Sequence, residues 1–472
     1  MTGSVFDNSQ IHSDTVSIMQ NVFLKDFGGK PEQTDSTKFD NTEAFSKAIG
    51  FLKTSGGGTL TVTEGIWHTG PIELFSNITL NLEKNAVISF FTDEERFPPV
   101  YTRWEGVDCY AMHPCVFANA QKNVKITGHG IIDGNGQDWW TKRIAKKPQA
   151  EPVTEIEKMF AKLNPDYKSQ PSGGGGRYIQ FLRPPLVQFY KSDDCKIEGI
   201  TIRNSPFWTV HPVYCKNLEI TGITVENPGE NAPNTDGIDI DSCKNVVVKN
   251  CRINVGDDAI VIKSGAGESG IKAAVPCSHV LVSGCTVHSG HGGIVLGSET
   301  AAGINNVVAE NCVFDGTDRG IRIKTRRQRG GALHDLTFSN LTIKDSLCPL
   351  AINMYYVCGA DPKDPYLFSL DAQEVDASTP SIRDLKISGI KATGCKASAG
   401  FIAGLPEAPV ENLSITDCYI ETNESSPQTP DVSDMFAGIP SVTEKSFRII
   451  NSKNLSITGT EIKGPAEKFL YN

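Results

Sequence analysis

The 472-residue sequence contains no uninterrupted apolar stretch of about 18 residues, the length that a membrane-spanning helix needs. Its first residues, 1–10, also lack the cationic segment and apolar run of a secretory leader. We therefore expect no membrane span and a cytoplasmic location, or a secreted or periplasmic one if a leader has been removed. The 13 cysteines include no Cys-x-x-Cys pair, so the sequence predicts neither a disulfide framework nor a zinc cluster.

The sequence also lacks an excess of positive charge. Lysine and arginine total 45 against 55 acidic residues, which gives a formal net charge of -10. This balance argues against a nucleic-acid partner and against an anionic membrane surface. With 39% hydrophobic and 21% charged residues, the composition is that of a folded protein rather than a disordered or membrane-embedded chain.

A repeated phrase of eight residues organises most of the chain. The phrase reads aliphatic-x-aliphatic-x-Gly/Asn-x-x-aliphatic, an alternation typical of short strands, and it recurs about ten times. Successive starts of the clear copies differ by 23, 28, 34, 27 and 29 residues. The clear copies begin at Cys195, Leu218, Val246, Val280, Val307 and Leu336, and weaker copies begin at Val124, Leu385, Leu413 and Leu455.

These periods are too short for a strand-helix-strand unit but suit a coil of two or three short strands and tight turns. A coil buries its aliphatic positions only by stacking on its neighbours. We therefore predict an all-β fold, a right-handed parallel β-helix that forms one domain over residues 1–472. Glycine or asparagine at the fifth position fits a bend, because both tolerate left-handed backbone angles. Cys251, Cys285, Cys312 and Cys418 share the next position, which indicates a stack of buried thiols.

Segments outside the repeat predict a cap and two insertions. Residues 40–53 carry capping residues and helically spaced apolar positions before Gly56, so we expect a helix that covers the first coil, within a cap segment of about residues 20–58. Residues from about 137 to 187, which include a run of four glycines at 173–176, and from 359 to 383 break the repeat. We interpret both as insertions on one flank that shape a substrate site. The apolar helix positions are Ala44, Phe45, Ala48, Ile49 and Leu52.

Polar residues gather where consecutive coils begin a second aliphatic run. Asp236 and Asp258 lie two residues before one shared anchor position, and Asp257 and His291 lie three residues before it. Equivalent positions in neighbouring coils are about 4.8 Å apart, so three carboxylates and an imidazole are predicted to share one small patch. The anchor position is occupied by Ile238, Ile260, Ile294 and Ile321.

Two cations are predicted to join this patch. Arg322 and Lys324 follow their anchor with the opposite parity from the buried aliphatics, so they should face outward along the same wall and complete a cleft. Clustered carboxylates repel one another, so one should keep its proton above its usual range beside an ionised neighbour. Glycosidic hydrolysis needs this pairing, because one acid protonates the leaving oxygen while another activates water. The fixed cations suit a substrate that carries carboxylates.

The polar runs resemble the signature of glycoside hydrolase family 28, the polygalacturonases. Its stretches NTD, DD, Gly-His-Gly and Arg-x-Lys occur in order at 234–236, 257–258, 290–292 and 322–324. The segment Asp26-Phe-Gly-Gly also looks like the family's entry segment, and the resemblance covers roughly residues 20–465. It is closest to the exo-acting bacterial branch.

The resemblance implies roles for the clustered residues. Asp257 would be the general acid, and His291 would tune its proton. Asp236 and Asp258 would position and deprotonate the attacking water, with inversion at the sugar carbon. The alternation of side chains along a strand leaves open which of Asp257 and Asp258 donates the proton.

The resemblance also implies how the substrate binds. Arg322 and Lys324 would grip a galacturonate carboxylate, and Tyr356, a better match than Tyr355, would line the sugar site. The two insertions could close one end of the cleft, where Arg183 is a candidate substrate contact, although a surface ion pair explains Arg183 equally well. The expected partner is an oligogalacturonide or pectic polysaccharide, with homogalacturonan favoured, and we expect neither a cofactor nor a bound metal.

Other functions stay open at this point. A calcium-dependent pectate lyase could bind its metal through Asp236, Asp257 and Asp258, but it would leave His291 unexplained. A β-helical carbohydrate-binding or adhesion protein would not need crowded acids. A hydrolase could also act on rhamnogalacturonan or on a xylose-decorated pectic polymer.

Overall fold

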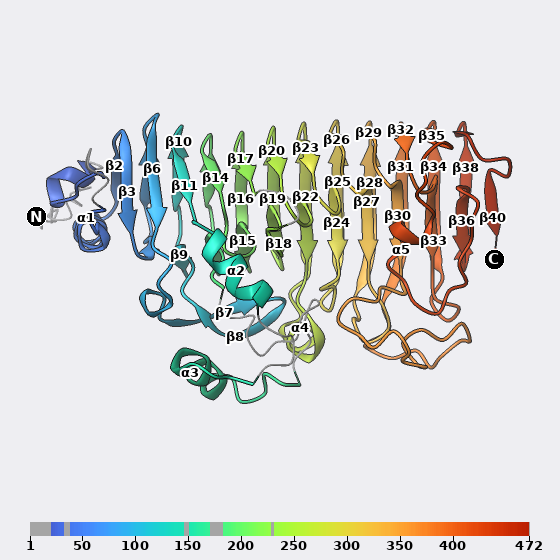
Figure 1. Ribbon diagram of the computed structural model, residues 1–472, viewed down its shortest axis with the longest axis horizontal. Helices are drawn as coiled ribbons and strands as arrows, with labels where there is room; N and C mark the ends of the chain where they lie inside the picture. Colours follow the sequence, from blue (N-terminus) through green and yellow to red (C-terminus); the bar gives the residue numbers. More distant parts are fainter. Residues whose placement is uncertain (1–19, 33–37, 146–150, 170–182, 228–230, 472) are drawn as a thin grey trace, which may run out of the picture.

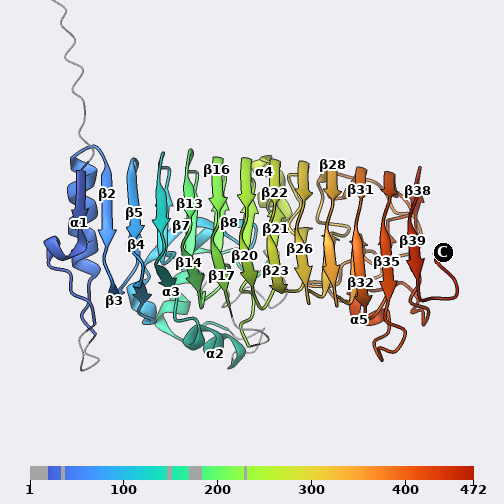
Figure 2. The same cartoon turned by 90° about the horizontal axis from the view of Figure 1, so that it is seen from above.

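The computed structural model describes residues 20–32, 38–145, 151–169, 183–227 and 231–471, and the chain winds into a long stack of coils (Figures 1 and 2). A typical coil contributes one strand to each of three sheets, and each strand pairs in parallel with the strand of the next coil. We call them the first, second and third sheet. The prediction of an all-β fold, a parallel β-helix, is therefore confirmed.

The strands of the three sheets have the following bounds. The first sheet contains β1 (Gln20–Phe23), β2 (Gly58–Val62), β5 (Ile78–Leu82), β10 (Lys125–Gly128), β13 (Lys196–Glu198), β16 (Lys216–Thr221), β19 (Lys244–Lys249), β22 (Cys277–Ser283), β25 (Ile304–Glu310), β28 (Ala332–Ser339), β31 (Ser381–Ser388), β34 (Val410–Thr416), β37 (Ser452–Lys453) and β38 (Ser456–Thr458). The second sheet contains β3 (Gly65–Thr69), β6 (Ala86–Phe90), β11 (Ile131–Asp133), β14 (Thr201–Arg203), β17 (Thr224–Glu226), β20 (Arg252–Asn254), β23 (Thr286–Ser289), β26 (Val313–Asp315), β29 (Thr342–Lys344), β32 (Lys391–Cys395), β35 (Tyr419–Thr422) and β39 (Glu461–Lys463). The third sheet contains β4 (Ile72–Glu73), β9 (Val116–Asn119), β12 (Val187–Tyr190), β15 (Val210–Val213), β18 (Ile238–Asp241), β21 (Ile260–Lys263), β24 (Ile294–Gly297), β27 (Arg319–Lys324), β30 (Cys348–Asn353), β33 (Gly400–Ala403), β36 (Phe447–Ile450) and β40 (Phe469–Tyr471).

The aliphatic positions of the repeat fill the interior of the stack. In the first sheet Val246 pairs with Val280, and Val280 pairs with Val307. All three side chains are at most 2% exposed. Like residues therefore lie on like residues from coil to coil, which buries a row of aliphatic side chains that one coil alone would leave in water.

The bend residues of the repeat behave as their types predict. Asn250, Gly284 and Asn311 all have left-handed backbone angles, with φ of 54°, 67° and 56°. A Cβ atom added to Gly284 would lie 2.5 Å from Asn250 Oδ1, so this copy of the bend requires glycine. Cys251, Cys285, Cys312 and Cys418 are buried free thiols as predicted. The first three stack on consecutive coils, whereas Leu341 and Ile390 hold the same position in the coils between Cys312 and Cys418.

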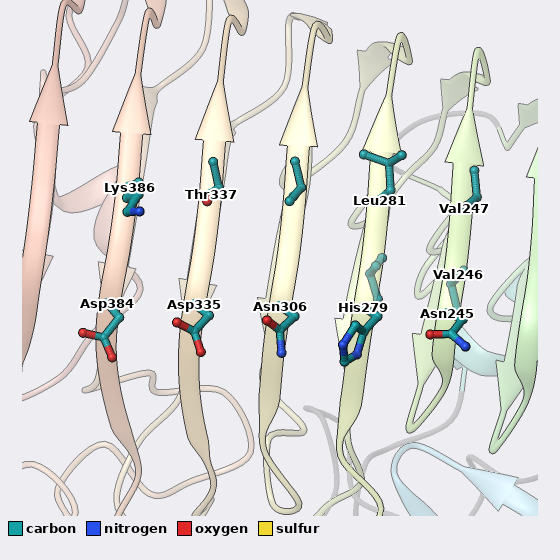
Figure 3. A pocket seen from close by; sticks show the side chains of 12 residues that line it. Asn245, Val246, Val247, His279, Leu281, Asn306, Asp335, Thr337, Asp384 and Lys386 are labelled. Atoms are coloured by element: carbon teal, nitrogen blue, oxygen red, sulfur yellow. The ribbon is translucent and has the colours of Figure 1, made fainter.

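A second row of left-handed residues crosses the outer face of the first sheet (Figure 3). Asn245, His279, Asn306, Asp335 and Asp384 occupy neighbouring strands, with φ between 53° and 59°. Their side chains border a surface pocket of about 680 Å³. This pocket belongs to the first sheet, whereas the predicted site residues belong to the third.

The predicted amino-terminal helix is confirmed as α1 (Thr42–Thr54). The chain turns at Gly56, which has a φ of 87°. In Figure 1 the helix lies at the end of the stack beside β2, where it covers the first coil as expected. The buried residues of α1 are the five predicted ones, Ala44, Phe45, Ala48, Ile49 and Leu52.

The segments that depart from the repeat lie on one flank of the stack in Figure 1. The predicted insertion at 137–187 contains α2 (Gln137–Ala145) and α3 (Glu155–Leu163), whereas its glycine run at 173–176 lies outside the described residues. The predicted insertion at 359–383 is irregular as far as Pro380, and its last residues begin β31. No helix within the described ranges is long and apolar enough to cross a membrane.

Further inserted segments, which the repeat does not predict, lie on the same flank. An antiparallel hairpin joins β7 (Pro99–Trp104) to β8 (Val107–Met112). Its alternating residues look like those of any other strand, so the repeat pattern did not set it apart. The remaining helical segments are η1 (Leu24–Phe27), η2 (Glu94–Arg96), α4 (Gly267–Ala273) and α5 (Asp431–Asp434).

Candidate active site

The register of the third sheet brings the predicted acids together. Ile238 pairs with Ile260, Ile260 with Ile294, and Ile294 with Ile321, so the four anchors stack as the sequence predicts. The residues before these anchors come from consecutive coils. One carboxylate oxygen from each of Asp236, Asp257 and Asp258 lies within 4.8 Å of the others.

Asp257 and His291 form a hydrogen-bonded pair. Asp257 Oδ1 and His291 Nδ1 are 3.1 Å apart, and the two side chains are 21% and 48% exposed. Burial raises the pKa of Asp257, but the hydrogen bond and positive charge of His291 outweigh it, so this pKa is lowered overall. The same hydrogen bond raises the pKa of His291. The pair therefore holds a proton to higher pH than an isolated imidazole would, and His291 lies next to solvent.

Asp258 is buried between the two predicted cations. Its oxygens lie 2.6 Å from an Arg322 nitrogen and 2.5 Å from Lys324 Nζ. Burial raises the pKa of Asp258, but Arg322 and then Lys324 hold it far below its usual range. Both cations face outward from the coil as their parity predicts, yet each is less than 10% exposed because inserted segments cover them. Met435 Sδ, for example, lies 2.9 Å from Arg322.

The pKa of Asp236 is shifted in the opposite direction from the pKa values of Asp257 and Asp258. Burial, followed by the negative charges of Asp239 and Asp257, raises the pKa of Asp236 well above its usual range. The positive charge of Lys263, whose Nζ lies 3.9 Å from Asp236 Oδ2, opposes this rise in pKa. Of the three clustered acids, Asp236 is therefore the hardest to ionise, whereas Asp257 and Asp258 are held in the ionised form by neighbouring positive charge.

Tyr356 lies beside the two cations. Its ring centroid is 5.6 Å from the Arg322 guanidinium and 5.3 Å from Lys324 Nζ. Tyr355, by contrast, is fully buried on the side of Arg327. The structure therefore brings Tyr356, and not Tyr355, to the cluster.

Arg183 is buried rather than ion-paired at the surface, so that alternative is wrong. Its guanidinium donates to the carbonyl oxygens of Pro206 and Pro233 and, at 2.8 Å, to Asn234 Oδ1. Asn234 begins the turn that carries Asp236. Arg183 therefore holds this turn against the inserted segment, which explains why a solvent-exposed partner is not needed.

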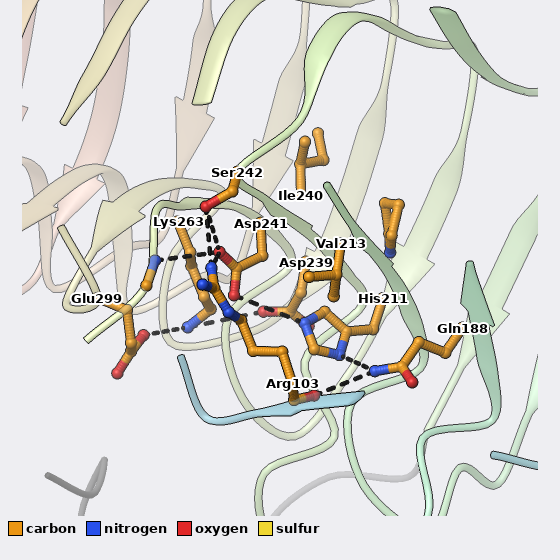
Figure 4. Close-up of polar contacts among 12 residues, drawn as sticks. Arg103, Gln188, His211, Val213, Asp239, Ile240, Asp241, Ser242, Lys263 and Glu299 are labelled. Atoms are coloured by element: carbon orange, nitrogen blue, oxygen red, sulfur yellow. Dashed lines mark hydrogen bonds and ion pairs between the residues drawn. The ribbon is translucent and has the colours of Figure 1, made fainter. Parts of the chain in front are cut away.

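A buried polar network on the amino-terminal side of the acids was not predicted (Figure 4). Arg103, from the β7–β8 hairpin, donates to Asp241 Oδ1 at 2.8 Å and to Ser242 Oγ at 2.9 Å. His211 lies 3.8 Å from the other Asp241 oxygen and 2.9 Å from Gln188. The one sign of this network in the sequence is that acidic residues alternate with isoleucine in β18. This alternation predicts that the acidic side chains face outward, but it does not predict what they contact.

Comparison with known proteins identifies the family to which the chain is similar. The family model described as "Glycosyl hydrolases family 28" matches residues 177–437. A "Probable polygalacturonase" of Vitis vinifera is 31% identical over 418 residues, covering 86% of this chain and 75% of the relative. An "Exo-poly-alpha-D-galacturonosidase" of Dickeya chrysanthemi is 27% identical over 442 residues, covering 87% of this chain and 71% of the relative.

A solved structure extends the agreement to the whole fold. The exopolygalacturonase of Thermotoga maritima superimposes with a TM-score of 0.74 at 33% identity, covering 95% of each chain. This likeness confirms the predicted right-handed parallel β-helix. It also favours the hydrolase over the pectate lyase. The chain belongs to glycoside hydrolase family 28.

Proposed function

We propose that this protein hydrolyses the α-1,4-galacturonosidic bonds of homogalacturonan or oligogalacturonides by an inverting acid/base mechanism that removes units from a chain end. One observation carries the proposal: a carboxyl group hydrogen-bonded to an imidazole lies beside a carboxylate held by two fixed cations. Such cations suit a substrate with a carboxylate on each ring. The names of the relatives support the same substrate.

The three acids, the histidine and the two cations each have a place in this mechanism. The Asp257–His291 pair gives its proton to the leaving glycosidic oxygen. Asp236 and Asp258 position the attacking water and accept its proton, so hydrolysis requires a pH above the raised pKa of Asp236. When galacturonate binds, Arg322 and Lys324 exchange part of their contact with Asp258 for the substrate carboxylate.

Inversion is the part of the proposal that comes from the family resemblance. In inverting enzymes the two carboxyl groups are typically about 6.5–9.5 Å apart. Here the closest oxygens of the three acids lie within 4.8 Å, a distance that joins oxygens rather than carboxyl centres. Proton NMR during the first turnovers decides the point, because inversion at an α-linked sugar releases the β anomer first.

Coverage of the third sheet on the amino-terminal side supports attack at a chain end. Gln188, His211, Asp239 and Asp241 face outward from the sheet, yet all four are fully buried. The β7–β8 hairpin contributes Arg103 to this cover (Figure 4). That part of the sheet therefore offers no surface along which a polymer could continue.

Inserted segments also cover the sheet on the carboxy-terminal side. Asn353 on β30 donates to the carbonyl oxygen of Asp434, and Phe401 on β33 packs against Phe436 at 5.7 Å between ring centroids. The acids thus lie between covered stretches of the same sheet, which supports a short substrate site rather than a long open groove.

Product analysis on a defined oligogalacturonide tests the proposed action. We expect monomeric galacturonate from the first time points, because only a chain end fits the site. A mixture of intermediate lengths at early times would contradict attack at a chain end. An unsaturated, ultraviolet-absorbing product would contradict hydrolysis itself.

The pH profile tests the role of His291. Because the pKa of His291 is raised by Asp257, the pair keeps its transferable proton below that raised value and loses it as the pH rises through it. In a His291→Asn variant Asp257 must hold the proton alone. The alkaline limb of kcat/KM should therefore move to lower pH, by about one unit or more. An unmoved alkaline limb would exclude the pair as the proton donor.

A cytoplasmic location is part of the proposal, with imported oligogalacturonides as the substrate. The 13 cysteines, all free thiols and all within the described residues, support a reducing compartment. Measuring the enzyme in separated cytoplasmic and periplasmic fractions tests this location.

A further inference from the structure

Lys263 is a buried cation next to the catalytic acids. It ends β21, the strand that follows Asp257 and Asp258, and it is 3% exposed. Its Nζ lies over the Trp208 ring, 4.2 Å from the centroid. A lysine is rarely buried to this extent unless opposite charges surround it.

Carboxylates from separate segments share this single ammonium group (Figure 4). Lys263 Nζ lies 2.8 Å from Glu299 Oε2, 3.6 Å from Asp239 Oδ1 and 3.9 Å from Asp236 Oδ2. Glu299 has a second cation, Arg329, at 3.4 Å. Within the part of the chain that the structure describes, Asp239 has no hydrogen-bond partner for either oxygen, and Lys263 is the only cation within 4.0 Å of Asp239 or Asp236.

The sharing has a consequence for Asp236. A buried carboxylate becomes hard to ionise when its counter-charge is removed. Glu299 is the carboxylate nearest to the ammonium group and Asp239 is the next, so Asp236 is the most distant of the three that it stabilises. The charge on Asp236 therefore depends on two residues outside the family signature.

We propose that Lys263 is a positioning residue that orients Asp236 and favours its ionised form for water activation, and that Glu299 weakens the effect of the Lys263 charge on Asp236. The proposal rests on the role of Asp236 in the proposed function. Through Asp236 it extends the catalytic machinery to the coil that carries Glu299.

Other charged groups face the same cluster and stay unchanged in the test below. They do not contact both Lys263 and Asp236, so they form a constant background for the comparison of variants. These groups are Asp257, Asp258, Arg183, Arg329, Lys324, His211, Arg103 and Asp241.

Two substitutions should move the acidic limb of kcat/KM in opposite directions. Lys263→Met keeps the length of the side chain but removes its charge, so Asp236 should hold its proton to higher pH and the acidic limb should move up by about one unit. Glu299→Gln leaves more of the Lys263 charge to Asp236, so the limb should move down. Lys263→Arg should restore most of the unaltered profile, because it keeps the charge.

A merely structural lysine would give a different result. Lys263→Met and Glu299→Gln would then lose thermal stability, while the acidic limbs of their kcat/KM profiles stayed where they are in the unaltered protein. That outcome would overturn the proposal. If Lys263→Met does not fold, the downward shift in Glu299→Gln decides the question alone. Lys272→Met, whose exposed side chain pairs with Glu268 on α4, is the matched control and should shift neither limb.

The same assay separates this proposal from the proposed function. If the unaltered protein releases no galacturonate from oligogalacturonides, the proposed function fails. If the unaltered protein hydrolyses them and the variants keep its acidic limb, only the inference about Lys263 fails.

Discussion

An Asp257→Asn enzyme is expected to bind a short oligogalacturonide normally but to hydrolyse it about 10³-fold more slowly, because an amide N–H is far too weak an acid to protonate the leaving oxygen. Asparagine has nearly the shape of aspartate, so His291 keeps a neighbour at 3.1 Å and the fold should be unaffected. The kcat from reducing-end release and the Kd from calorimetry on trigalacturonate measure the two effects separately.

A matched carboxylate far from the site provides the control. Asp335 lies on the outer face of the first sheet with a φ of 55°, a conformation that asparagine tolerates. Asp335→Asn should therefore keep kcat within about twofold, as an exposed substitution usually has little effect. More than a tenth of the normal rate in Asp257→Asn would move the donor role to Asp258 or Asp236.

Arg322→Gln should reduce both activity and stability. It leaves Asp258, which is fully buried, with Lys324 as its remaining ion-pair partner among the described residues, and removing a partner from such a pair costs about 3 kcal/mol of unfolding free energy. It also removes a donor for the substrate carboxylate, so kcat/KM should fall about 100-fold. Chemical denaturation and initial rates on digalacturonate measure the two losses.

Arg322→Lys distinguishes charge from geometry. Lysine keeps the positive charge but loses the planar fork, so stability should recover more than kcat/KM. Arg383→Gln, a substitution of a half-exposed arginine paired with Asp384, is the control and should change neither quantity by more than its error. Normal kcat/KM in Arg322→Gln would remove Arg322 from substrate binding.

The parts of the molecule that follow from one-dimensional periodicity could be predicted from the sequence. Stacking Ile260 on Ile294 needs only the repeat and the spacing between strands, and this alone brings Asp258 near His291. The amino-terminal helix could be predicted for the same reason, since its buried face is set by spacing along one segment.

Contacts between distant segments could not be predicted in this way. Arg103 meets Asp241 across 138 residues, and nothing in a strand-like hairpin indicates which coil it will cover. The pairing of Lys324 with Asp258 was missed for a related reason. Parity shows that a side chain faces outward, but not whether an inserted segment then buries it with an acid.

The placement of the acids on successive coils also limits how this protein can change over evolution. In the three sheets each strand pairs with strands of the neighbouring coils, so turns can be added at either end of the stack without moving the reactive centre. An extra turn between β18 and β21, by contrast, would separate Asp236 from Asp258 by a further strand spacing of about 4.8 Å and end the chemistry. Differences in the length of substrate that is accepted should therefore arise in the flanking loops, while the number of coils between the acids stays the same.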